Sequence, residues 1–156
     1  NLIGRQAAPL QFKDTAARSL SLYKTPAKFT VLVFWDPTCG HCKEIVPQVA
    51  SAYEASWKAA GVKVFAVNVD EKTLTAWDNF IADKHIEDWI NVYQVKEVRD
   101  KEANSGQAGY RQLYDVFKTP TLYLLDGQKR IIAKNLDVKG FDEVIAARNK
   151  KRPTTN

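Results

Sequence analysis

Two cysteines, separated by only two residues, closely follow the longest apolar run of this 156-residue chain. The stretch 29–35 is rich in β-branched and aromatic side chains, which predicts a buried central strand. After a short loop, apolar residues recur at helical spacing from Cys42 onward, and Gly61 ends the pattern as glycine commonly ends a helix. Any fold must therefore hold the segment Cys39-Gly40-His41-Cys42 where a buried strand gives way to a helix.

This position favours a reactive thiol. The first turn of a helix has free N–H groups and a partial positive charge, which lower a thiol pKa below its usual value of about 8.5. Cys39, at the exposed end, is predicted to be the attacking nucleophile, and Cys42, one turn further in, the residue that resolves the mixed disulfide. The pair closes almost no loop, so it is not a structural cross-link. The pattern predicts thiol–disulfide exchange.

A zinc site is the main chemical alternative. Structural zinc requires four ligands, and the chain has no second Cys-x-x-Cys or paired-histidine motif. His41 lies between the cysteines and His85 is isolated in the sequence. We therefore expect no metal and no cofactor. The metal-binding function that remains as an alternative is that of a metal chaperone.

Composition is that of an ordinary globular domain. Hydrophobic residues make up 45% and charged residues 26% of the chain, and we expect one domain over residues 1–156. No apolar run reaches the roughly 18 residues of a membrane span. The net charge of +5 is spread along the chain, so we expect no nucleic-acid partner. Residues 150–156 are predicted to form a flexible basic tail. Because the chain starts at Asn1, we expect a processed or excised piece, with a possible anchor outside it.

The remaining pattern predicts an α/β fold with a mixed sheet. Residues 1–27 are predicted to be an N-terminal extension that forms a hairpin or cap, and residues 96–106 a polar loop. Asp126-Gly127 is a hairpin signal. Further strands are expected at residues 62–69, 89–94, 121–125 and 130–133. Further helices are expected around residues 74–81, over 107–116 and around 141–145.

Several segments resemble the thioredoxin superfamily. Phe34-Trp35, the Cys39 to Cys42 motif and Pro47 resemble that family's active-site strand, dithiol and kinked helix, and Thr119-Pro120 its cis-proline loop. Residues 3–9 resemble the opening of the TlpA/ResA-like branch. The resemblance implies a thioredoxin fold, with a mixed central sheet flanked by helices and an N-terminal β-hairpin extension. It also implies a catalytic pair and supporting residues, namely Cys39, Cys42, Gly40, His41, Trp35, Thr119 and Pro120.

The branch also implies a biological setting. Its members are mostly extracytoplasmic, are often membrane-anchored, and reduce disulfides in exported proteins. The resemblance therefore implies protein clients that carry a disulfide or dithiol, an upstream thiol–disulfide electron donor, and a location outside the cytoplasm.

The chain departs from the family at the proton acceptor for Cys42. Val33 stands where thioredoxin has a buried aspartate, and Ile45 stands where many members of the branch have an acid. Thr38 replaces the usual aromatic residue before the first cysteine. Asp36 is either a substitute acceptor or a loop cap beside Pro37.

Other interpretations remain open. A peroxiredoxin-type peroxidase is disfavoured because Pro37 and Thr38 lie immediately before Cys39, which does not fit that spacing. A disulfide oxidase or isomerase would use the same motif, and a client-binding module with little turnover would use the same surface. His41 either tunes the dithiol or is a solvated loop residue, and Trp35 either packs beneath the dithiol or fills the core.

Overall fold

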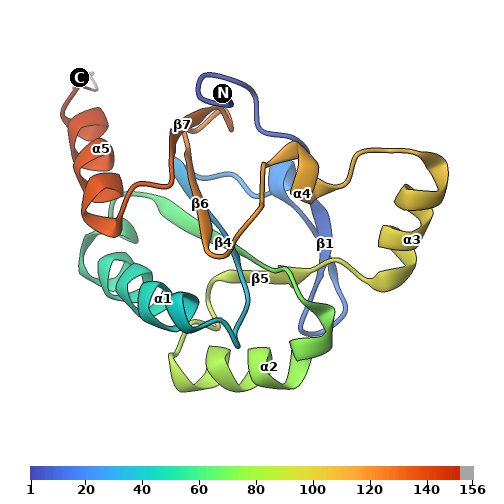
Figure 1. Ribbon diagram of the computed structural model, residues 1–156. Coiled ribbons are helices and arrows are strands. Elements are labelled where there is room, and N and C mark those ends of the chain that lie inside the picture. Colours follow the sequence, from blue (N-terminus) through green and yellow to red (C-terminus); the bar gives the residue numbers. More distant parts are fainter. Residues whose placement is uncertain (152–156) are drawn as a thin grey trace.

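The computed structural model describes residues 1–151, which form a seven-stranded mixed sheet with helices on its faces (Figure 1). The strand order is β2-β1-β5-β4-β3-β6-β7. The strands are β1 (Gln11–Asp14), β2 (Ser19–Ser21), β3 (Phe29–Trp35), β4 (Val62–Asn68), β5 (Ile90–Tyr93), β6 (Thr121–Leu125) and β7 (Ile131–Lys134). The helices are α1 (Gly40–Ala52), α2 (Leu74–Asp83), α3 (Lys96–Ser105), α4 (Tyr110–Leu113) and α5 (Val138–Lys151), with short turns η1 (Leu22–Lys24), η2 (Tyr53–Trp57) and η3 (Glu71–Thr73).

Strand β3 lies at the centre and leads directly to the dithiol. It pairs in parallel with β4 and antiparallel with β6, and all seven of its residues are buried. Val33 and Trp35 point into the core on one face of the sheet, and Leu32 and Phe34 into the core on the other. A strand covered on both faces is apolar throughout rather than alternating, which explains the run seen in the sequence.

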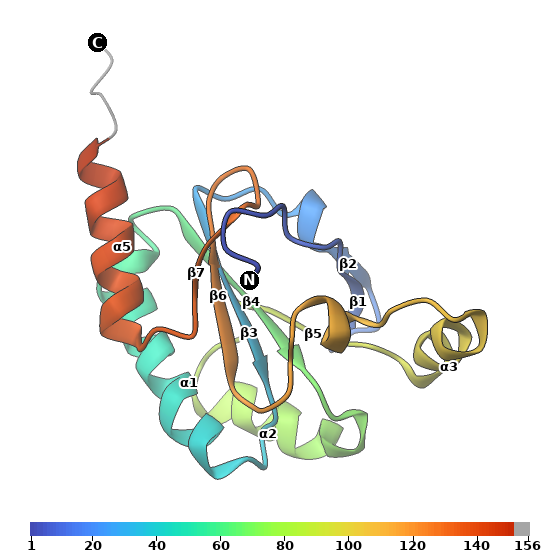
Figure 2. The ribbon, with the colours of Figure 1, turned by 45° about the horizontal axis from the view of Figure 1, so that its top comes forward.

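Helices α1, α2 and α5 cover the first face (Figure 2). Each contributes an apolar stripe to the same core, including Val46 from α1, Trp77 from α2 and Phe141 from α5. The stripe that starts at Cys42 continues past α1 through the π-helical turn η2 to Gly61, whose φ of 85° is readily accessible to glycine. The predicted helices around residues 42–61, 74–81 and 141–145 are confirmed.

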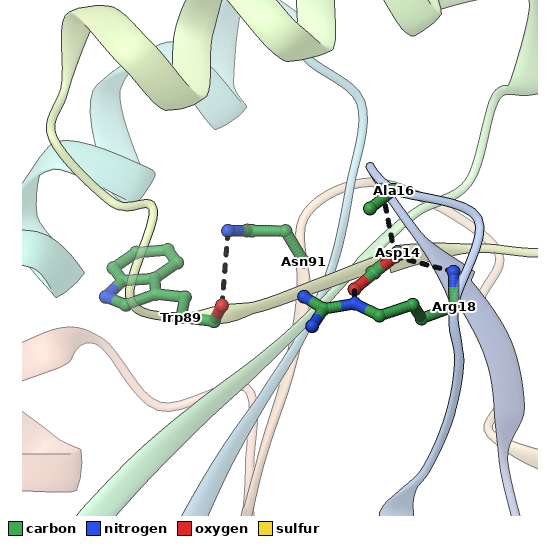
Figure 3. Close-up of polar contacts among 5 residues, drawn as sticks. All are labelled: Asp14, Ala16, Arg18, Trp89 and Asn91. Carbon is green, nitrogen blue, oxygen red and sulfur yellow. Dashed lines mark hydrogen bonds and ion pairs between the residues drawn. The ribbon is translucent and has the colours of Figure 1, made fainter.

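The N-terminal extension and α4 cover the second face. Strands β1 and β2 form the expected hairpin, and β1 adds it to the sheet by pairing with β5. In the hairpin turn, the Asp14 carboxylate accepts hydrogen bonds from the backbone N–H of Ala16 at 2.9 Å and of Arg18 at 2.8 Å (Figure 3). The Asn91 amide donates to the Trp89 carbonyl at 3.4 Å, just where β5 begins (Figure 3).

Two predictions about the polar segment after β5 are wrong. Residues 96–105 form helix α3 rather than a loop, and helix α4 has only one turn instead of spanning residues 107–116. No residue of α3 is buried, so it has no apolar stripe to detect, and charged helix-forming residues with a left-handed Gly106 cap define it instead. Helix α3 lies at the periphery in both ribbon views.

The predicted basic tail, residues 150–156, begins inside α5. Residues 150 and 151 belong to this helix, and the rest of the tail lies outside the described residues. Within residues 1–151, no helix has the length and hydrophobicity needed to cross a bilayer.

Candidate active site

Cys39 is the N-cap residue of α1. Its sulfur accepts a hydrogen bond from the Cys42 backbone N–H at 3.3 Å, and its thiol lies 3.6 Å from the Thr119 carbonyl oxygen. Partial burial of the side chain raises the Cys39 pKa. Hydrogen bonding with the side chains of Cys42 and Thr119, and with the backbone N–H groups of Cys42 and His41, lowers this pKa and outweighs the effect of burial. The Cys39 pKa is therefore lowered.

Cys42 lies one turn further along α1 and is fully buried. Burial raises the pKa of its thiol to about 12, because the thiolate would be removed from water. Both cysteines are free thiols in this structure. Cys39 is thus a partly buried thiol with a lowered pKa, and Cys42 is a fully buried thiol with a raised pKa.

The loop before β6 faces the dithiol. The Thr119–Pro120 peptide bond is cis, as expected from the resemblance. Asn135, which follows β7, holds the start of β6 in place: its N–H donates to the Leu122 carbonyl at 2.7 Å, and its side-chain oxygen accepts from the Leu122 N–H at 2.9 Å. Thr119 and Pro120 are therefore fixed beside the helix start.

His41 and Gly40 form the exposed first turn of α1. The His41 Nδ1 atom lies 3.6 Å from a Glu44 carboxylate oxygen, and both side chains are largely exposed. The backbone N–H of His41 is among the groups that stabilise the Cys39 thiolate. A Cβ atom on Gly40 would meet no atom within 4 Å, so packing does not require glycine there.

Trp35 ends β3, and Asp36 begins the loop that leads to Cys39. Trp35 is fully buried, belongs to the same core as Cys42, and packs edge-on against Phe80 with 5.0 Å between ring centroids. The Asp36 carboxylate accepts from the Thr38 N–H at 2.8 Å and the Thr38 hydroxyl at 2.7 Å. Asp36 thus acts as a loop cap, the second of the two roles considered from the sequence.

A groove of about 330 Å³ lies beside the dithiol. It runs between the start of α1, the Thr119-Pro120 loop and the segment from β7 to α5. Sequence reasoning missed the third wall, because residues 135–138 carry no motif and reach the Thr119-Pro120 loop only through the pairing of β6 with β7. Its lining residues are His41, Ile45, Lys118, Thr119, Pro120, Leu122, Asn135, Leu136, Asp137 and Val138.

The sheet order, the dithiol at the start of α1 and the cis-proline loop beside it define a thioredoxin-like protein. The chain belongs to the AhpC/TSA family, whose model matches residues 3–148. None of the curated proteins matches the chain. By family and fold, the chain is a thioredoxin-like thiol–disulfide oxidoreductase.

Three solved structures illustrate the similarity. A domain of a possible thiol-disulfide isomerase from Cytophaga hutchinsonii is 32% identical, with 99% of this chain and 98% of that chain covered and a TM-score of 0.80. A thioredoxin-like protein from Bacteroides caccae is 26% identical, with 93% and 49% covered and a TM-score of 0.74. A thiol:disulfide interchange protein from Bacteroides sp. is 23% identical, with 96% and 89% covered and a TM-score of 0.73, which shows a shared fold.

Proposed function

We propose that the protein reduces disulfides in exported proteins through a cycle of Cys39 and Cys42. The observation that carries the proposal is the contrast between the two thiols: Cys39 is accessible with a lowered pKa, and Cys42 is buried one turn away with a raised pKa. In such a pair, one sulfur can attack a client disulfide, and the second sulfur can then resolve the mixed disulfide.

The cycle has two exchanges. The Cys39 thiolate attacks one sulfur of the client disulfide, forms a mixed disulfide, and releases the other client sulfur as a thiolate. Cys42 then attacks the Cys39 sulfur, which frees the second client sulfur and leaves a Cys39–Cys42 disulfide. An upstream dithiol donor must reduce that disulfide before the next turn. Thr119 and Pro120 would place the client backbone, with Gly40, His41 and Trp35 supporting the dithiol.

The setting is proposed from resemblance. The opening residues 3–9 are similar to those of the TlpA/ResA-like branch, whose members are mostly extracytoplasmic. This resemblance supports a place outside the cytoplasm for a single thioredoxin-like domain over residues 1–156.

Selective alkylation and trapping test the assigned roles. At pH 7, iodoacetamide should modify Cys39 of the reduced protein at least about 10³ times faster than Cys42, because only thiolates react. Cys42→Ala should accumulate mixed disulfides with clients in cells, and a Cys39→Ser, Cys42→Ala control should capture none. Equal labelling of the two thiols, or equal capture by the control, would remove the roles proposed for them.

Disulfide isomerisation or oxidation is the second candidate function. Two observations favour it: the relative from Cytophaga hutchinsonii is named as a possible isomerase, and a lowered Cys39 pKa stabilises the reduced protein, which makes its disulfide a stronger oxidant. The reduction potential separates the candidates. A reductant should lie near the value of about −270 mV typical of thioredoxin, and an isomerase or oxidase between about −180 and −120 mV.

A further inference from the structure

Two large apolar side chains are exposed beside the dithiol. Phe117 lies two residues before Thr119 and is 86% exposed, more than any other large hydrophobic residue among residues 1–151. Leu136 is 41% exposed and lines the groove beside Thr119 and Pro120. Apolar surface is unfavourable in water, and exposed apolar groups that gather at one place mark a surface for interaction.

The position of Phe117 is fixed by the contacts of its loop. Its N–H donates to the Asp115 carbonyl at 3.1 Å, and the Asp115 carboxylate lies 3.6 Å from the Lys134 ammonium group on β7. On the other side of Phe117, the Lys118 carbonyl accepts from the Thr121 hydroxyl at 2.7 Å. The aromatic ring is therefore presented to solvent by a segment that is held at both ends.

Phe117 and the groove both lie close to where a client would be bonded to Cys39. The Thr119 carbonyl oxygen lies 3.6 Å from the Cys39 sulfur. Two residues of extended chain span at most about 7 Å, so the Cα atom of Phe117 is no further than this from that of Thr119. A client cysteine joined to Cys39 has its Cα atom within about 7 Å of the Cys39 Cα atom. The client residues that flank this cysteine therefore lie next to the loop and the groove.

The groove has the size and lining to receive a large apolar side chain. Its volume of about 330 Å³ equals on the order of ten water molecules at about 30 Å³ each. Three ionisable residues line it, His41, Lys118 and Asp137, and all three are exposed, so their charges can stay in water. Half of its ten lining residues are apolar, namely Ile45, Pro120, Leu122, Leu136 and Val138.

A client that pairs with Thr119 would present alternate side chains to this surface. The Thr119 N–H takes part in no hydrogen bond within residues 1–151, and its carbonyl accepts only from the Cys39 thiol, so an extended client can pair with both. Side chains of an extended chain point alternately to opposite sides. The client cysteine must point at Cys39. The residues two positions before and after it therefore point the same way, and its immediate neighbours point away.

We propose that Phe117 and Leu136 select client disulfides that have a large apolar side chain two residues from the attacked cysteine. The inference rests on the proposed function and names its substrate class. Large apolar side chains are most often buried in native proteins, so such disulfides are most accessible in unfolded or misfolded chains. The chemistry is the first exchange of the cycle, and Phe117 and Leu136 act on it through binding, as specificity-determining residues.

Three peptides with one cysteine each test the selection. The cysteine is joined to thionitrobenzoate, whose acidic thiol is the better leaving group, so attack on the peptide sulfur releases a coloured thiolate. The first peptide has serine at the two positions on each side of the cysteine. In the second, leucine replaces the serines two residues before and after the cysteine, and in the third it replaces the immediate neighbours.

The second-order rate constant with the second peptide should exceed that with the first by about tenfold or more, because leucine side chains leave water. The third peptide has the same composition as the second, and its rate constant should lie within about threefold of the first. Equal rate constants for the second and third peptides, or for the second and first, would overturn the proposal.

Variants assign the selection to the two side chains. Phe117→Ser and Leu136→Ser should each lower the rate constant with the second peptide by about threefold or more and leave that with the first unchanged. Val98→Ser is the matched control, because Val98 is 42% exposed, much as Leu136 is, but lies on the peripheral helix α3 (Figure 2). An equal loss in Val98→Ser, or full selection in the Phe117→Ser, Leu136→Ser double variant, would contradict the assignment.

A small disulfide keeps the two proposals apart. The symmetrical disulfide of thionitrobenzoate has no flanking residues, so every variant should reduce it at the wild-type rate, which also shows that each dithiol is intact. If the wild type does not reduce it, the exchange cycle itself is wrong. If all the proteins reduce it equally and none distinguishes the peptides, the cycle stands and the client selection alone fails.

Discussion

On the first face of the sheet, three helices pack apolar stripes against the strands, whereas on the second face an extended N-terminal segment and a single helical turn lie over aromatic rings. Helices satisfy most of their own backbone groups, so the first face needs few polar partners. The second face needs them: the hydroxyls of Tyr23, Tyr114 and Tyr123 donate to the carbonyls of Ala7, Ala8 and Tyr114.

The difference separates function from stability. The first face buries Cys42 among apolar side chains and leaves Cys39 at its edge, so its chemistry comes from burial. The second face fastens the N-terminal extension with tyrosine hydroxyls. Changes at the dithiol should therefore alter exchange with little effect on stability, and changes at the tyrosines should do the reverse.

The largest expected effect is the loss of exchange in Cys39→Ser. A serine hydroxyl is a good N-cap but a poor nucleophile towards disulfides, so dithiothreitol-driven insulin reduction should fall to the uncatalysed rate. The free energy of unfolding in urea should change by no more than about 0.5 kcal/mol. Retained catalysis would assign the chemistry to another group. A large loss of stability would contradict the assignment of exchange to the first face and of stability to the second.

Tyr114→Phe should have the opposite signature. Tyr114 is fully buried, and loss of its hydroxyl leaves the Ala8 carbonyl without that donor. We expect a loss of about 1–3 kcal/mol in the free energy of unfolding, with activity per folded molecule unchanged. Tyr23→Phe is the matched control and should cost less, because that side chain is partly exposed and water can replace the hydroxyl. An equal cost in both variants would contradict this explanation.

Alkaline pH should weaken the second face. Burial raises the pKa of Tyr123 to about 12, above the usual value of about 10. Because the folded protein holds this proton more tightly, the stabilisation is complete below about pH 10 and is lost as pH rises towards about 12. Tyr123→Phe should therefore flatten the decline in unfolding free energy over this window by about 1–2 kcal/mol.

The measurement should use the disulfide form of the protein, because the raised pKa of Cys42 adds a decline of the same sign in the reduced form. A steeper decline in the reduced wild type than in the oxidised wild type is the corresponding expectation for the first face. Identical slopes in Tyr123→Phe and the wild type would exclude the tyrosine as the source.

The smallest expected effect concerns His41. An imidazolium near the start of α1 favours the Cys39 thiolate and hence the reduced form, so His41→Pro should make the potential more negative by some tens of millivolts at most, where about 30 mV corresponds to 1.4 kcal/mol. Proline also removes the backbone N–H that stabilises the Cys39 sulfur. His41→Gln isolates the imidazole and should shift the potential less.

Equilibration against glutathione measures the potential, and thiolate absorbance against pH measures the Cys39 pKa. If His41→Gln leaves both unchanged while His41→Pro shifts them, the backbone N–H is the tuning group and the imidazole is only the partner of Glu44. If neither variant shifts the potential, His41 is a solvated loop residue.

Much of the fold followed from hydrophobic periodicity, because most elements bury a face. The bounds of β3 were predicted without error, since burial on both faces leaves a continuous apolar run. Helix α3 was missed for the converse reason: it buries nothing, and its only marks are helix-forming residues and the Gly106 cap. The predicted length of α4 was also wrong, because the aromatic residues of this segment pack against the sheet without a helical repeat.

The order of residues along the chain placed two thiols on the first turn of a helix that follows a buried strand, and local electrostatics then assigned different roles to Cys39 and Cys42. Those conclusions needed only neighbours within a few positions. The Thr119 carbonyl at the Cys39 sulfur and the groove wall at residues 135–138 required the folded chain. Groups up to about a hundred residues apart meet there because β6 pairs with both β3 and β7. The hairpin signal at Asp126-Gly127 predicts the second pairing, and no local pattern encodes the first.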